Sequence, residues 1–141
     1  MILLDTSVLV YAVGADHPLR DPCARLLAGH RDGTIMATTT VEAVQEFVHV
    51  YARRRDRAAA AALAGLYADA FSLIETTPAD LRAGLHLFVR HPELGAFDSV
   101  LAAVALARGA TALVSADRAF GLVADLHWLD PASAATELAP S

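Results

Sequence analysis

Four acidic residues that are far apart in the sequence occur where a sheet-based fold can bring carboxylates together: Asp5, Glu46, Asp98 and Asp117. Two carboxylates about 4 Å apart repel each other by about 4 kcal/mol at an effective dielectric constant of about 20. Such a cluster persists when a divalent cation neutralises it or when one acid keeps its proton. Ligand sets made of oxygen alone suit Mg²⁺ or Mn²⁺. The four acids therefore indicate metal-assisted chemistry, provided that the fold gathers them.

The three aspartates also have a structural interpretation, because aspartate commonly caps the N-terminus of a helix. Asp5 follows an apolar run, and Thr6 or Ser7 can cap the next helix in its place. Asp98 opens another expected helix, where Ser99 can serve equally well as the cap. Asp117 can cap the short helix that follows it. The first two helices do not require their acids as caps, which leaves a chemical role open.

Glu46 belongs to an amphipathic helix predicted over Val41–Arg54. At about 100° per residue, its apolar side chains form one face, and a separate polar stripe contains Glu42, Glu46, His49 and Arg53. This periodicity alone favours a solvated face on which Glu46 pairs with Arg53. On the same grounds, Glu42 is as good a candidate for chemistry as Glu46.

Strand and helix patterns alternate along the chain. Strands are predicted at Ile2–Leu4, Thr34–Ala37, Leu73–Glu75, Ala112–Val114 and His127–Leu129. After a first helix that ends near Val13, further helices are predicted at Leu19–His30, Val41–Arg54, Ala58–Phe71, Thr77–Arg90, Phe97–Arg108 and Arg118–Val123. This alternation predicts an α/β fold with a central parallel sheet of four or five strands flanked by helices. Ligands of such sheets bind beyond the carboxyl ends of the strands.

The bulk composition suggests one domain that does not enter a membrane. No linker or repeat divides the 141 residues, so we expect a domain over residues 1–131 and a loosely held tail over 132–141. Hydrophobic residues make up 55% of the chain and the mean hydropathy is +0.42. No stretch approaches the ~20 apolar residues of a spanning helix. The first five residues lack the basic region of a signal peptide, so we expect a cytoplasmic protein.

Cysteine, histidine and lysine usage argues against several classes of enzyme. Cys23 is the one cysteine, which excludes an internal disulfide and a thiolate zinc site. The six histidines form no His-x-x-x-His pair, so a zinc hydrolase is not expected. All eleven basic residues are arginine, which removes every mechanism that needs an amine. The net charge of −5 argues against non-specific binding to polyanions, although one basic block contains Arg53, Arg54, Arg55 and Arg57.

The segments around the four acids resemble, in order, the acidic motifs of the PIN domain family. They are LLDTSVLVYA from Leu3, TTTVEAVQEFVHV from Thr38, FDSVLAAVA from Phe97 and VSADRAF from Val114. In the second motif the family's glutamate precedes Phe or Leu, which selects Glu46 over Glu42. The resemblance covers the chain as far as about Pro131. Size and motif style look most like the VapC-type toxins of bacterial toxin–antitoxin pairs.

This resemblance implies a Mg²⁺-dependent endoribonuclease that hydrolyses RNA phosphodiesters, with Mn²⁺ as a substitute cofactor. Asp5 and Asp98 would be the main metal ligands, and Glu46 and Asp117 would complete the site. The implied partners are an RNA substrate, an antitoxin protein that keeps the enzyme inactive, and a second copy in a homodimer. The arginine block (Arg53, Arg54, Arg55 and Arg57) would contact the RNA backbone, or it would be a solvated helix end.

Four other functions are alternatives to a nuclease. Receiver domains need a lysine near the phosphorylated aspartate, and this chain has none. Haloacid-dehalogenase-like phosphatases look like Asp-x-Asp at the first strand, whereas the second position here is Ser7. A nucleotide-binding protein would need a glycine-rich phosphate loop, which is absent from the sequence. A catalytically silent PIN-like module that binds RNA or protein remains the main alternative to a nuclease.

Overall fold

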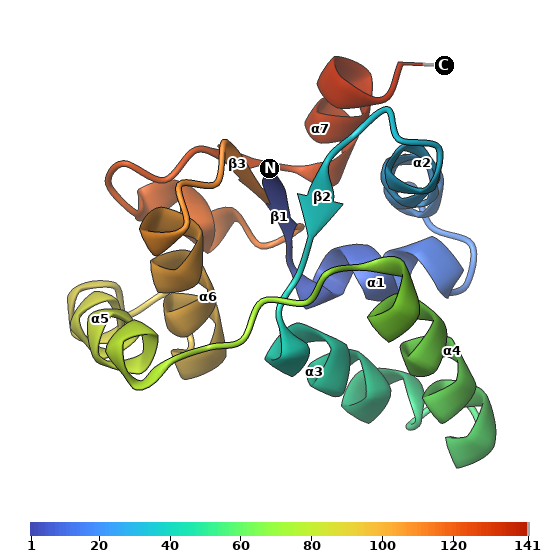
Figure 1. Cartoon of the computed structure of the whole chain (residues 1–141), viewed down its shortest axis with the longest axis horizontal. Coiled ribbons are helices and arrows are strands. Elements are labelled where there is room, and N and C mark those ends of the chain that lie inside the picture. The colour runs from blue at the N-terminus through green and yellow to red at the C-terminus, as the bar shows by residue number, and fades with distance from the viewer. Residues whose placement is uncertain (141) are drawn as a thin grey trace.

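The structure, a computed structural model, describes residues 1–140. Within them a four-stranded parallel sheet occupies the centre, in the order β2-β1-β3-β4 (Figure 1). Its strands are β1 (Ile2–Leu4), β2 (Ala37–Thr38), β3 (Ala112–Val114) and β4 (Trp128–Leu129). The helices around it are α1 (Thr6–Val13), α2 (Arg20–Arg31), α3 (Val41–Tyr51), α4 (Arg57–Ala70), α5 (Pro78–Arg90), α6 (Ala96–Ala107), the 3₁₀ helix η1 (Arg118–Leu122) and α7 (Pro131–Leu138). The predicted α/β class with a parallel sheet flanked by helices is confirmed.

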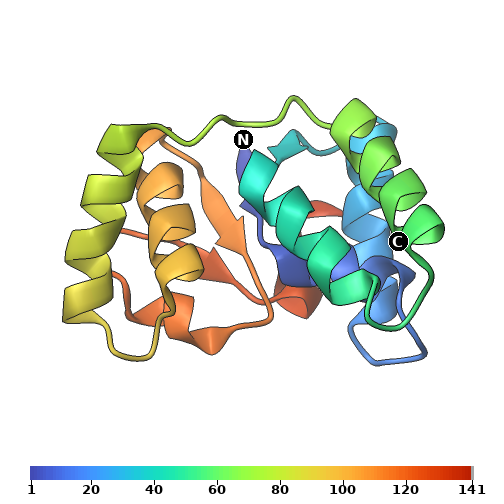
Figure 2. The same ribbon diagram turned by 90° about the horizontal axis from the view of Figure 1, so that it is seen from below.

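The sheet divides the hydrophobic core into two layers, because successive side chains of a strand point to opposite faces. Ile2 and Leu4 of β1 pack on one face with residues of α1, α2, α3, α4 and α7. Leu3 and Leu113 pack on the other face with α6 and η1. Figure 2 shows α3 and α4 on one side of the sheet and α5 and α6 on the other. The carboxyl edge of the sheet therefore lies at the boundary between the two layers.

Helices α5 and α6 form a close pair that an ion pair holds at one end. A Cβ added at Gly84 in α5 would lie 2.7 Å from the Cα of Val100 in α6, so this approach requires glycine. The Arg108 guanidinium donates to both carboxylate oxygens of Asp80 at 2.8 Å, and Asp80 is only 4% exposed. Arg108 also donates to the carbonyl of Glu75 at 3.2 Å. These contacts fix α6, which carries one of the candidate acids, against the rest of its layer.

One expected strand does not join the sheet. Within Leu73–Glu75, Ile74 forms a single parallel bridge with Thr40, and its N–H donates to the Thr39 carbonyl at 3.0 Å. Strand β2 ends before this point and α3 begins directly after Thr40, so little extended chain is left to pair with. The expected strand at Thr34–Ala37 is likewise displaced, since β2 begins at Ala37.

The C-terminal segment, expected to be a loose tail, forms helix α7 against α2. The Asp130 side chain caps the first turn of α7. Ala134 and Ala135 are fully buried, and Arg25 of α2 donates to the Ala139 carbonyl at 2.6 Å. The small residues of this segment predicted a loose tail, but in the structure they allow α7 to pack closely against α2.

Asp80→Asn is expected to destabilise the protein by about 2–3 kcal/mol, because Arg108 loses the charged partner that it meets in a largely buried position. The Arg108 guanidinium holds the pKa of the Asp80 carboxyl well below its usual range. A lowered pKa stabilises the fold above the unfolded-state value of about 3.9, and the contribution is lost as pH falls further. Urea unfolding should therefore show a smaller difference from wild type at pH 3 than at pH 7.

The matched control for this variant is Asp69→Asn, at an exposed position of α4. The control should keep the stability of the wild type at both pH values. Equal stabilities of the two variants at pH 7 would contradict the role given to the ion pair.

Candidate active site

Asp5 lies at the carboxyl end of β1, and one of its carboxylate oxygens is committed to the fold. Its backbone N–H donates to the Val114 carbonyl of β3 at 2.9 Å. Its Oδ2 accepts from the Ser7 hydroxyl at 2.8 Å and from the Ser115 hydroxyl at 2.7 Å. Its Oδ1 has no donor among residues 1–140. Asp5 is therefore the N-cap of α1, in place of the expected Thr6 or Ser7, and still presents one free oxygen.

Glu46 reaches the same edge from α3, which hydrogen bonds hold against the start of α1. The Thr40 hydroxyl caps α3 by accepting from the Ala43 N–H at 3.1 Å. The hydroxyl of Thr6 donates to the Ala43 carbonyl, also at 3.1 Å. These bonds place Glu46, one turn further along α3, beside Asp5. Burial and the negative charge of Asp5 raise the pKa of Glu46.

Asp98 and Asp117 approach from the other layer of the fold. Asp98 is the third residue of α6, whose N-cap is Gly95, so neither Asp98 nor its neighbour Ser99 caps the helix. Asp117 caps η1 with its Oδ1, which accepts from the Ala119 N–H at 2.9 Å. Burial, and then the negative charges of the three other acids, raise the pKa of Asp98 to about 7. The structure thus brings the four acids within electrostatic reach of one another.

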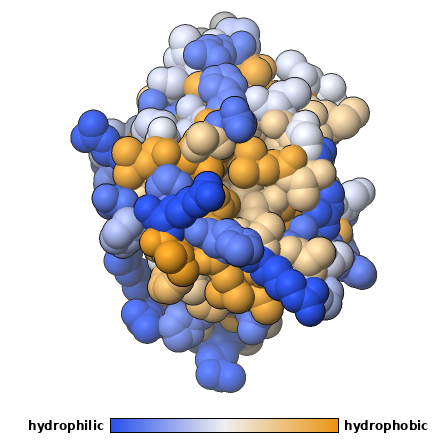
Figure 3. Space-filling view, turned by 90° about the vertical axis from the view of Figure 1, so that its left-hand side faces the viewer, coloured by the Kyte–Doolittle hydropathy of each residue, from blue (hydrophilic) through white to orange (hydrophobic). Residues whose placement is uncertain are grey.

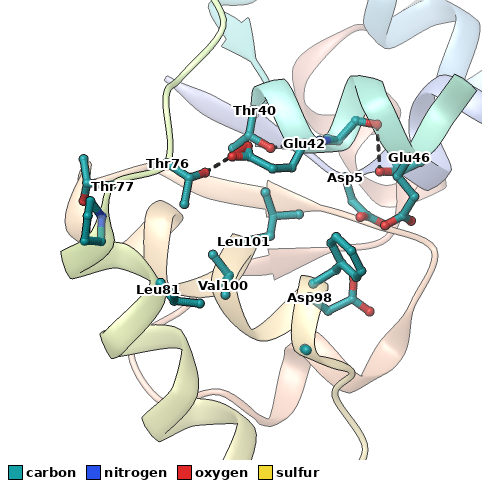
Figure 4. Close-up of a pocket in the computed structure, with 15 residues that line it drawn as sticks. Asp5, Thr40, Glu42, Glu46, Thr76, Thr77, Leu81, Asp98, Val100 and Leu101 are labelled. Atoms are coloured by element: carbon teal, nitrogen blue, oxygen red, sulfur yellow. Dashed lines mark hydrogen bonds between the residues drawn. The ribbon is translucent and has the colours of Figure 1, made fainter.

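A pocket of about 540 Å³ opens between α3 and the α5–α6 pair, and the acids stand at one end of it. Asp5, Glu46 and Asp98 line this end, as Figure 4 shows, while Glu42 lies toward the other end beside Thr76. Asp117 does not line the pocket, and its side chain is exposed to solvent. We call the four carboxylates of Asp5, Glu46, Asp98 and Asp117 the acid cluster.

The donor set of the acid cluster fits a hard divalent cation. All four groups are carboxylates, and a cation would relieve the repulsion that contributes to the raised pKa of Asp98. Among residues 1–140, no group of three or more His, Cys, Asp or Glu side chains lies close enough together to hold a metal ion by itself. Mg²⁺ does not require such a group, because it keeps several waters and takes one or two carboxylates together with phosphate oxygens. The residues present therefore fit Mg²⁺ or Mn²⁺.

Two serines position Asp5, although the sequence patterns do not single them out for this role. Ser7 is expected there only as a helix cap, and Ser115 only as part of a motif. Besides donating to Asp5, the Ser7 hydroxyl accepts from the Ala116 N–H at 3.1 Å, and the Ser115 hydroxyl accepts from the Asp117 N–H at 2.9 Å. The signal that could have found them is a serine two residues from an aspartate in both strand-end motifs.

His49 and the arginines that follow α3 lie on the side toward α4, although the charge of His49 still lowers the pKa of Glu46. The pairing of Glu46 with Arg53 that the periodicity favoured does not form, since the Arg53 guanidinium lies 3.0 Å from Nε2 of His49. His49, Arg53 and Arg57 line a second hollow between α3 and α4. Arg54 is exposed in the turn that joins these helices.

Comparisons with known proteins give one family match, similar sequences and similar folds. The pattern of the PIN domain matches residues 2–126. Ribonuclease VapC7 of Mycobacterium tuberculosis is 54% identical over 136 residues, which cover 95% of this chain and 94% of that protein. Two solved structures have a similar fold. One is VapBC2 from Rickettsia felis bound to a DNA fragment from its promoter (TM-score 0.71, 15% identity, 92% of this chain and 98% of that chain). The other is PAE2754 from Pyrobaculum aerophilum (TM-score 0.70, 23% identity, 99% of this chain and 90% of that chain).

Asp5→Asn is expected to lower the pKa of Asp98 in the metal-free protein from about 7 toward its ordinary value, because Asp5 is the strongest of the charges that raise it. A ¹³C NMR titration of the side-chain carboxyls measures this change. Asp21→Asn, at an exposed position of α2, should leave the pKa of Asp98 where it is.

The raised pKa also predicts a pH dependence of stability. The folded, metal-free protein binds the Asp98 proton more tightly than the unfolded chain, so its stability should fall as pH rises from about 4 to about 7. If the pKa of Asp98 were the same in wild type and in Asp5→Asn, the two carboxyls would not be neighbours.

Proposed function

Since the chain belongs to the PIN domain family, and within it to the VapC ribonucleases, we propose that the acid cluster is the active site of a Mg²⁺-dependent endoribonuclease. The chain is the ribonuclease toxin of a VapBC toxin–antitoxin pair. The observation that supports this site most directly is the convergence of four carboxylates from both layers of the fold, where burial and then the shared negative charge raise the pKa of Asp98. A convergence of this kind is costly unless a cation or a proton offsets it.

Asp5 and Asp98, one from each layer, are the residues that would hold Mg²⁺ or Mn²⁺. The bound cation would offset the charge of the acids and stabilise the negative charge that builds on the phosphate. The serines at Oδ2 of Asp5 leave its Oδ1 free for this role. No lysine is present, so any positive side chain at the phosphate has to be arginine.

Glu46 is the candidate general base. Its raised pKa brings its carboxylate closer to the operating pH, which is the condition for efficient proton transfer. Glu46 takes a proton from the attacking water, the water oxygen bonds to phosphorus, the bond from phosphorus to the leaving sugar oxygen breaks, and that oxygen takes up a proton from solvent water. Asp117, exposed at the same edge, orients the water and exchanges protons with solvent.

The partners follow from the family and from the surface. RNA is the substrate, and an antitoxin protein is the regulatory partner. We also propose a homodimer, formed through the exposed apolar side chains of α5: Leu85, Phe88 and Val89. Figure 3 shows apolar side chains gathered over the side of the molecule on which α5 lies. Sedimentation of wild type and of Leu85→Glu tests this interface, since the variant should be a monomer.

The proposed location is the cytoplasm, where RNA and antitoxin both occur. Within residues 1–140, no helix has the length and apolar character needed to cross a bilayer.

Asp5→Asn should lower RNA cleavage at least 100-fold, because it removes one charge from the acid cluster but hardly changes the side-chain volume. Cleavage of a labelled single-stranded RNA in Mg²⁺ measures the rate, and circular dichroism checks the fold. Asp69→Asn, exposed on α4, should cleave at the rate of the wild type. Wild-type cleavage by Asp5→Asn would show that the acid cluster is not the active site.

The arginine block is a candidate contact to RNA phosphates, since all four side chains are exposed. Replacing Arg54 and Arg55 by Gln should reduce the slope of log affinity against log salt by about 0.7 for each lost phosphate contact. RNA binding by the Asp5→Asn protein, in which cleavage does not interfere, measures this slope. Replacing Arg82, exposed on α5, is the control, and an unchanged slope for the block would discard the contact.

A further inference from the structure

The pocket beside the acid cluster extends well past the carboxylates. Its volume of about 540 Å³ lies within the range of about 300–1,000 Å³ that is typical of small-molecule sites. Away from the acids its walls are mainly apolar, with Leu81 of α5 and Val100 and Leu101 of α6 among them. A site for phosphate alone would need no apolar chamber, so the pocket has room for another part of a substrate.

Phe97 is an exposed aromatic residue at the acid end of this pocket. It directly precedes Asp98 in the first turn of α6, lines the pocket and is 69% exposed. A single exposed apolar residue is ordinary, but this one lines an apolar pocket and directly precedes a candidate catalytic acid. Aromatic rings in such places stack on the unpaired bases of single-stranded nucleic acids.

Glu42 supplies a hydrogen-bonding group toward the other end of the pocket. It is half-buried, and the Thr76 hydroxyl donates to its Oε2 at 3.0 Å (Figure 4). Among residues 1–140 it forms no ion pair. A carboxylate in this position accepts hydrogen bonds and cannot donate them. It therefore favours a ligand that brings donors into the apolar chamber.

The spacing along α3 relates this group to the acid cluster. Glu42 and Glu46 are four residues apart, which corresponds to about 6 Å along the helix axis. This span is comparable to that between the phosphate and the base of one nucleotide. A nucleotide whose phosphate lies at the acid cluster can thus place its base in the pocket.

We propose that the pocket binds the base of the nucleotide next to the scissile phosphate, with Phe97 stacking on it and Glu42 reading its edge, and that this base is guanine. The inference rests on the proposed function, since it takes the acid cluster as the place of cleavage. Guanine is the base whose Watson–Crick edge offers two adjacent donors, the N1–H and the amino group, to the two oxygens of one carboxylate. Adenine and cytosine each offer an amino group beside an acceptor, which a carboxylate repels.

The first test measures binding without cleavage. Guanosine, adenosine, cytidine and uridine are titrated into the metal-free protein and followed by NMR. Guanosine should shift resonances of pocket residues at concentrations roughly tenfold lower than the other nucleosides do. Phe97→Leu should weaken guanosine binding roughly five- to tenfold, and Phe97→Tyr, which keeps the ring, should restore it.

The second test reads the base preference of cleavage. A pool of random single-stranded RNA is cleaved in Mg²⁺ and the products are sequenced, which should show guanine enriched at one fixed position beside the cut. Glu42→Gln replaces one acceptor by a donor, so the preference for guanine over adenine should fall roughly tenfold. Glu93→Gln, at an exposed position outside the pocket, should keep the full preference.

The outcomes separate the pocket from the nuclease. Guanosine binding that depends on Phe97, without any RNA cleavage that depends on Asp5, would support the pocket and overturn the proposed function. A second outcome is cleavage that depends on Asp5 but shows no guanine preference, while nucleoside binding is unchanged in Phe97→Leu. This result would contradict base binding in the pocket and would still agree with the proposed nuclease function. A change of oligomeric state in Phe97→Leu, with unchanged nucleoside binding, would assign the pocket to contact between two copies and equally overturn the inference.

Discussion

Repulsion between like charges is the constraint on which the rest of this structure depends. Carboxylates gathered at the edge of a sheet would move apart unless the backbone that carries them were held in place. The chain fixes each one by a different element: Asp5 by the junction of β1 and β3, Glu46 by α3, Asp98 by α6 and Asp117 by the cap of η1. The cost of this arrangement is visible in the pKa of Asp98, which burial and neighbouring charge raise to about 7.

The division of Asp5 between two roles shows how the fold meets this constraint. Two serine hydroxyls and a backbone amide donate to one oxygen of the carboxylate and hold its orientation. The other oxygen is left without a donor among the described residues. In the sequence, a helix cap and a metal ligand are competing interpretations of Asp5. The structure allows both roles at once, because a carboxylate has two oxygens.

The sequence predicted those parts of the fold and site that depend on local pattern. Apolar runs followed by acids located β1 and β3, and the rule that parallel strands share a carboxyl edge placed Asp5 and Asp117 near each other. Periodicity could not choose between Glu46 and Glu42, because both lie on the same polar stripe, and the choice needed the resemblance to a family. The expected strand at Leu73–Glu75 was wrong because pairing depends on the length of the neighbouring strand. The hydroxyl of Ser115 meets Asp5 only through the tertiary fold, across 110 residues, whereas Ser7 reaches Asp5 locally, from two residues away.

The position of the acid cluster on the boundary between two separately packed cores has a consequence for how the protein tolerates variation. Glu46 is carried by the layer of α1 to α4 and Asp98 by the layer of α5 and α6, so the gap between them depends on how each layer packs. A cavity opened at Phe47 in one layer, or at Val104 in the other, would let its helix drift by a fraction of an ångström and alter the field at the carboxylates. Substitutions between apolar residues in either hydrophobic core would then change the pKa values of the distant carboxylates. The rate of catalysis would therefore constrain the packing of both cores.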